Sequence, residues 1–111
     1  MTESAVSDVC ILHPVGRIDG SSSADFQTKL LEAIGRASGG VVIDFNEIDY
    51  ISSAGLRALM TAVRQRKDRH LAVAGLRPVI VEIFEIARFQ HVIKIFGTAA
   101  EAISSWSTPR P

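Results

Sequence analysis

Residues 41–45 read Val-Val-Ile-Asp-Phe and directly follow two consecutive glycines. A nearly continuous apolar run of this length is typical of a strand that other elements cover on both faces of a sheet. Apolar residues at helical spacing lie on either side of it, over residues 22–37 and from Ser52-Ser53 onward. Because strands covered on both faces occur in sheets flanked by helices, the run predicts an α/β sandwich whose sheet is at least partly parallel.

Two more helices are predicted toward the C-terminus. Pro78 is a favourable first residue for a helix, and apolar residues at helical spacing follow it over residues 79–87. Thr98, with Glu101 three residues later, has the pattern of a helix cap and predicts a last helix over residues 98–105.

Short apolar runs bounded by glycine or proline predict further strands. Pro14 indicates that the first of them lies near an edge of the sheet or ends there. Residues 46–50 are expected to form a polar connection, and the pattern does not decide whether residues 5–9 add an edge strand. The strands predicted beside the central one are residues 9–15, 71–74 and 92–96.

The length and composition favour one globular domain over residues 1–111. With 47% hydrophobic and 22% charged residues, the chain can bury a core, expected over about residues 5–107, while residues 108–111 are expected to form a flexible tail. Twelve basic residues balance twelve acidic ones, so the net charge favours neither direct binding of nucleic acid nor binding to a membrane surface.

Cysteine usage and hydropathy favour a soluble protein of the cytoplasm. Cys10 is the only cysteine, so the chain cannot form an internal disulfide. The first residues, MTESAVSDV, lack the basic and apolar regions of a secretory signal. The apolar-leaning stretch 79–95 carries charged residues throughout, so no membrane insertion is expected.

Most signatures of catalysis are absent from the sequence, which predicts a protein that is not an enzyme. His13, His70 and His91 fall on three different predicted elements, whereas a zinc site needs three or four convergent ligands. We therefore expect no metal and no cofactor. A small enzyme or nucleotide-binding protein stays as an alternative, although the sequence has no phosphate-binding glycine loop.

The segment 44–57, DFNEIDYISSAGLR, brings a strand, a polar turn and the start of a helix together. Either Ser52 or Ser53 can be a plain helix cap, worth about 1 kcal/mol. The same position also suits a phosphoserine, since a phosphate there would meet free backbone N–H groups and the positive end of the helix dipole. Gly55 is interpreted as leaving the first turn thin enough for a partner's backbone to approach.

The run IDYISSAGLRAL resembles the phosphorylation loop of STAS domains, as found in anti-sigma-factor antagonists and stressosome proteins. GRIDGSSSADF resembles the turn of that family before its first helix, and VVIDFNEIDY resembles its central strand and loop. LAVAGLRPVIVEIFEIARFQHVIKIF resembles the remaining strand, helix and strand. The resemblance implies a STAS-type sandwich with a mixed sheet of four to five strands and about four helices.

The resemblance also implies a site. It places the modified serine at Ser53 and leaves Ser52, where many members carry aspartate, as a second candidate. Asp19 is interpreted either as a turn former before the first helix or as part of the partner-binding face. The partner-binding residues implied are Asp19, Ser21, Asp44, Asn46, Ser52, Ser53, Ala54, Gly55, Leu56 and Arg57.

The mechanism implied is partner switching. The unphosphorylated antagonist would bind an anti-sigma factor that is also a serine kinase of the histidine-kinase-type ATPase fold, and so free a sigma factor. Phosphorylation of Ser53 would break that complex, and a PP2C-type phosphatase would restore it. The basic residues Arg57, Arg64 and Arg66 would meet an acidic partner surface or simply form a solvated helix face.

Two questions of assembly stay open from the sequence. The alternative function is a non-phosphorylated accessory STAS subunit of a lipid-transporting ABC complex or another ATPase complex. A weak homodimer is the other open possibility.

Overall fold

A computed structural model describes residues 1–107 of the chain, so the tail expected at 108–111 lies outside the described residues. Its main sheet has five strands in the order β1 (Thr2–Val6), β2 (Val9–His13), β4 (Gly40–Asp44), β6 (Leu71–Ala74) and β7 (Lys94–Phe96). β1 is antiparallel to β2, and the other three pairs are parallel. This mixed sheet confirms the predicted fold class.

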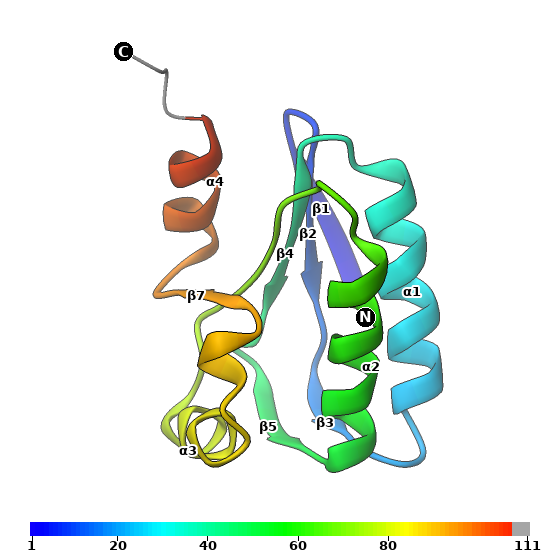
Figure 1. The fold of residues 1–111 in the computed structure, drawn as a ribbon, viewed down its shortest axis with the longest axis vertical. Helices are drawn as coiled ribbons and strands as arrows, with labels where there is room; N and C mark the ends of the chain where they lie inside the picture. Colours follow the sequence, from blue (N-terminus) through cyan, green and yellow to red (C-terminus); the bar gives the residue numbers. More distant parts are fainter. Residues whose placement is uncertain (108–111) are drawn as a thin grey trace.

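The central strand is covered on both faces, as its apolar run predicts. α1 (Ser23–Arg36) and α2 (Ser53–Gln65) lie on one face and α4 (Ala99–Ser107) on the other (Figure 1). Val41 and Ile43 belong to the larger core under α1 and α2, whereas Val42 belongs to a smaller core under α4, and all three are fully buried. Successive side chains of a strand point to opposite faces, so one short run serves both cores.

A second, two-stranded parallel sheet leads from the main sheet to the starts of α1 and α2. It consists of β3 (Gly16–Ile18) and β5 (Ile48–Ile51). The prediction that residues 46–50 form only a polar connection is therefore wrong. Ile48 and Ile51 are buried while the two residues between them are not, so the segment lacks the alternation by which a strand is recognised.

The other predicted elements need smaller corrections. β2 ends at His13, directly before Pro14, and it is an inner strand between β1 and β4. Residues 2–6 form the edge strand β1 that the pattern of residues 5–9 left open, and all five of its residues are exposed. The last strand begins only at Lys94, because Phe89–His91 form a 3₁₀ turn, η1, after α3 (Pro78–Ile86).

The last helix has the predicted cap. The Glu101 N–H donates to Thr98 Oγ1 at 3.1 Å. Over the part of the chain that the structure describes, no helix is long and apolar enough to cross a membrane.

Candidate functional site

β3 and β5 bring two helix starts to the same place. Ile18 lies opposite Ile51 in their ladder, and the Ser52 N–H donates to the Ile18 carbonyl oxygen at 2.8 Å. Beyond these residues one chain segment leads through Asp19 into α1, and the other leads through Ser52 into α2 (Figure 1). The site is therefore built on a sheet end, with two helix N-termini side by side.

The two adjacent serines have different roles. Ser52 is the N-cap of α2, with extended backbone angles, and its Oγ accepts a hydrogen bond from the Gly55 N–H at 3.3 Å. Ser53 is the first residue of the helix and is exposed. Within residues 1–107 its hydroxyl has no hydrogen-bond partner. The capping interpretation thus holds for Ser52, and the Ser53 hydroxyl is exposed and takes no part in the cap.

Gly55 faces the interior of the protein. A Cβ at this position would lie 2.6 Å from Ile51 Cγ1, 2.9 Å from Ile18 Cγ2 and 3.0 Å from the Ile18 carbonyl oxygen. The interpretation of Gly55 as room for a partner is therefore wrong in its geometry, because the space is filled by β3 and β5. What the glycine provides is a close approach of α2 to these strands.

Asp19 is held in a network of short-range hydrogen bonds. Its Oδ1 accepts from the Ser21 N–H at 3.0 Å and from the Ser21 hydroxyl at 2.7 Å. These two bonds, followed by the Arg17 guanidinium 3.5 Å from Oδ2, lower the pKa of the Asp19 carboxyl below its usual value. The turn-forming interpretation is confirmed, and the side chain is still 31% exposed beside the start of α2. Its place in a partner-binding face stays a prediction.

Arg17 and Tyr50 are neighbours that the sequence did not single out. They lie opposite each other in the β3–β5 ladder, and the Arg17 guanidinium carbon lies 4.5 Å from the centre of the Tyr50 ring. Recognising that residues 48–51 form a strand would have revealed the pair. The stacking holds a cation beside Asp19 and the start of α2.

Asp44 and Asn46 lie at the opposite end of β5 from Ser53, about 13 Å away along four strand residues. Asp44 Oδ1 accepts from the Asn46 N–H at 2.9 Å, and its Oδ2 lies 3.6 Å from His13 Nδ1. Arg77 Nε donates to the Asn46 carbonyl oxygen at 2.8 Å. The structure therefore divides the predicted partner-binding residues into two groups.

The first turn of α2 completes the group around Ser53. Leu56 is half-buried and packs against the larger core, whereas Ala54 is half-buried and Arg57 is exposed one turn after Ser53. No acidic side chain lies in this first turn. The helix dipole of α2 can thus stabilise a negative charge that is added at its N-terminal end.

The described residues contain no group of three or more His, Cys, Asp or Glu side chains that could hold a metal ion. His13 lies beside Asp44, while His70 and His91 lie near β7.

Comparisons with known proteins agree with this architecture. The STAS domain model matches residues 4–102. BtrV of Bordetella bronchiseptica, which is named as an anti-sigma factor antagonist, is 26% identical over 98 residues, or 86% of this chain and 84% of BtrV.

Solved structures share the fold at low sequence identity. An anti-sigma factor antagonist from Mycobacterium paratuberculosis has a TM-score of 0.88 at 15% identity, covering 96% of this chain and 92% of that one. SpoIIAA of Bacillus, also an anti-sigma factor antagonist, has a TM-score of 0.78 in its unphosphorylated form and 0.69 in its phosphorylated form. Both forms are 16% identical and cover 94% of this chain, and 93% and 96% of their own.

A sulfate transporter family protein of Wolinella succinogenes has the same fold, with a TM-score of 0.77 at 15% identity over 93% of this chain and 88% of that one. The fold alone therefore does not separate antagonists from transporter domains. The family itself is settled by the match over nearly the whole described chain: this protein belongs to the STAS domain family, and anti-sigma factor antagonists are among its relatives.

Proposed function

We propose that this chain is a phosphoserine-switched anti-sigma factor antagonist of the cytoplasm, a binding protein that catalyses no reaction. The observation that carries the proposal is the exposed Ser53 hydroxyl at the start of α2, free of hydrogen bonds while the neighbouring Ser52 caps the helix. The names of BtrV and SpoIIAA, and the existence of SpoIIAA in a phosphorylated form, support it.

In this proposal the unphosphorylated face around Ser53 binds an anti-sigma factor that is also a serine kinase of the histidine-kinase-type ATPase fold. Asp19, Ser21 and the first turn of α2 are its core, and Asp44 and Asn46 are reached only by a partner that extends along β5. Arg57 provides a cation for an acidic partner surface. A PP2C-type phosphatase resets the switch.

Phosphorylation would act through charge. A phosphate adds about −1.5 to −2 charges at Ser53, next to the Asp19 carboxylate, whose pKa is lowered by Ser21 and Arg17. The helix dipole of α2 tolerates this charge within the folded domain. A partner carboxylate that faces the site would repel the phosphate. A repulsion that removes several kcal/mol of binding free energy at the centre of an interface lowers the affinity by orders of magnitude.

The test is incubation of the purified protein with ATP and each ATPase-type kinase of its genome, followed by mass spectrometry. We expect phosphate on Ser53 in the wild type and in Ser52→Ala, which is the matched control, and none in Ser53→Ala. Ser53→Asp should abolish binding to the kinase, and Ser53→Ala should make binding constitutive. Equal binding by these two variants would contradict the switch.

A second candidate is a STAS domain that works with a transport protein without phosphorylation. The fold shared with the Wolinella succinogenes transporter protein favours it. Such a domain would co-purify with a transport ATPase or transporter to the same extent in the wild type, Ser53→Ala and Ser53→Asp.

A further inference from the structure

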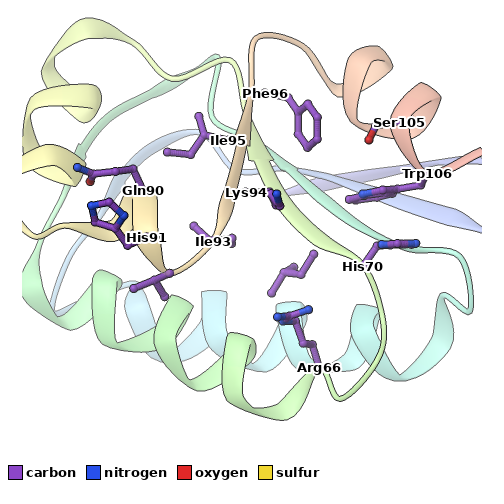
Figure 2. A pocket seen from close by; sticks show the side chains of 12 residues that line it. Arg66, His70, Gln90, His91, Ile93, Lys94, Ile95, Phe96, Ser105 and Trp106 are labelled. Atoms are coloured by element: carbon purple, nitrogen blue, oxygen red, sulfur yellow. The ribbon is translucent and has the colours of Figure 1, made fainter.

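An open groove of about 770 Å³ runs along the outer edge of β7, at the other end of α2 from Ser53. Figure 2 shows Lys94, Ile95 and Phe96 on the strand that crosses the middle of the lining, with His91 on one side of this strand and Trp106 on the other. Its lining residues come from the end of α2, the start of β6, η1, β7 and α4.

β7 is the last strand of the main sheet and pairs only with β6. An edge strand leaves backbone N–H and carbonyl groups that another extended chain can pair with. Lys94 and Ile95 are exposed, and Ile95 is 39% exposed although it is apolar. This edge is therefore suited to a further strand.

The lining is cationic. Arg66 and Lys94 are the charged residues that line the groove, and none of its lining residues is a carboxylate. The chain as a whole has no net charge, so this is a local excess of positive charge. Charge complementarity therefore selects an acidic occupant.

Aromatic side chains line the side of the groove next to α4. The rings of His70 and Trp106 are stacked with their centroids 4.8 Å apart and an angle of 8° between their planes. Phe96 meets Trp106 edge to face, with 6.5 Å between the centroids. Phe96 lies on the face of β7 that also carries Lys94, whereas the exposed Ile95 lies on the opposite face. An added strand of alternating character can therefore turn its acidic side chains toward Lys94 and the aromatic rings, and its apolar side chains toward Ile95.

From these features we propose that the groove binds an extended acidic segment of a partner protein, which adds a strand to β7. An edge backbone pairs with another backbone, which favours a protein segment over a small anion. The groove lies about 20 Å from Ser53, along the 13 residues of α2. Binding here is therefore independent of phosphorylation at Ser53, and both surfaces can be occupied at once.

The probe is a seven-residue peptide of alternating valine and glutamate, titrated into the wild-type protein. Trp106 is the only tryptophan of the chain, so its fluorescence reports directly on the groove. We expect a saturable change with the acidic peptide, and none with a peptide that carries lysine in place of glutamate.

Lys94→Glu is expected to weaken binding about tenfold or more, because a favourable charge becomes a repulsive one. The matched control is Arg64→Glu, which makes the same change of net charge at an exposed residue outside the groove lining. Thermal unfolding of both variants verifies that they fold. Equal weakening by the two variants would show that only net charge matters and would overturn the proposal.

Two further measurements need no mutation in the groove. A peptide N-methylated at alternate residues keeps its charges but cannot pair as a strand, and we expect it not to bind. If the methylated peptide binds as tightly as the unmodified one, or if inorganic pyrophosphate displaces both peptides equally, the groove is a simple anion site and the proposal is overturned. Ser53→Asp should bind the acidic peptide as the wild type does, and loss of binding would overturn the independence of the two surfaces.

Discussion

The two ends of α2 border different kinds of surface, yet each surface lies beside a closely packed glycine. At the N-terminal end, Gly55 lets the helix approach β3 and β5, and the result is a tightly packed helix start that presents one free hydroxyl. At the C-terminal end, Gly40 at the start of β4 lies under the stacked rings of His70 and Trp106, beside an open groove.

The glycines differ in what they contribute. Gly55 is an inner residue of a helix, so only the space around it requires the absence of a side chain. Gly40 has a φ of +116°, a conformation that other residues rarely adopt, and it is crowded as well. The groove end therefore depends on backbone conformation and close packing together, whereas the Ser53 end depends on close packing alone.

Gly40→Ala should show the larger effect of the two. The added Cβ would lie 2.7 Å from His70 Cβ and 2.8 Å from the His70 carbonyl oxygen, and the backbone strain adds to this overlap. We expect a loss of roughly 2–5 kcal/mol in the free energy of unfolding. Urea unfolding followed by circular dichroism measures the loss, and a shift in Trp106 emission would report the displaced stack.

The control for this substitution is Gly35→Ala. Gly35 lies exposed in α1, and a Cβ there would meet nothing within 4 Å. We expect it to leave stability unchanged or raise it by up to about 1 kcal/mol through helix propensity. If the Gly40→Ala protein were as stable as Gly35→Ala, the residues around Gly40 could move aside at no cost, and the expected loss of stability would be wrong.

Gly55→Ala should have a smaller effect on stability but should act on the Ser53 end. The Cβ would overlap Ile18 and Ile51, including a backbone oxygen that cannot rotate away, while the helix gains propensity. The net expectation is a loss of about 1–2 kcal/mol, measured by urea unfolding. Because α2 must shift away from β3 and β5, the rate of Ser53 phosphorylation should change in this variant and stay at the wild-type value in Gly35→Ala.

This comparison could be predicted from the sequence only in part. The run at residues 41–45 and the helical spacing around it were enough to predict the sandwich and its central strand. The pattern does not predict β5, because the buried residues Ile48 and Ile51 stand three apart, and it does not decide whether β1 forms, because none of the residues of β1 is buried. Without β5, the sequence does not predict that an extended strand separates Asp44 from Ser53.

The groove has no local signal in the sequence. Its lining comes from segments as far apart as Arg66 and Trp106, and only the folded sheet brings them together along β7. The motif at Ser52-Ser53, in contrast, is contiguous, so its position at a helix start could be predicted. Which of the two serines caps the helix depended on backbone geometry, and only the structure shows that it is Ser52.

The smallest expected effect is on the acid response of the Ser53 end. Hydrogen bonds from Ser21 and the nearby Arg17 lower the pKa of Asp19, so the folded state binds this proton less readily than the unfolded state does. The contribution of Asp19 to stability is therefore fully present above the unfolded value of about 3.9 and is lost as the pH falls through the lower folded pKa. The groove lining has no carboxylate that could respond in the same way.

A pH titration of the Ser21 amide by nuclear magnetic resonance tests this directly, since that N–H donates to the Asp19 carboxylate at 3.0 Å. We expect a transition with a midpoint below about 3.9 in the wild type and no such transition in Asp19→Asn. The indole N–H of Trp106 should show no transition in this range, because no carboxylate lines its surroundings in the groove. A Ser21 midpoint at or above 3.9 would mean that the hydrogen bonds of the Asp19 turn do not stabilise the charged carboxylate, and Asp19 would then contribute nothing to the acid response of the Ser53 end.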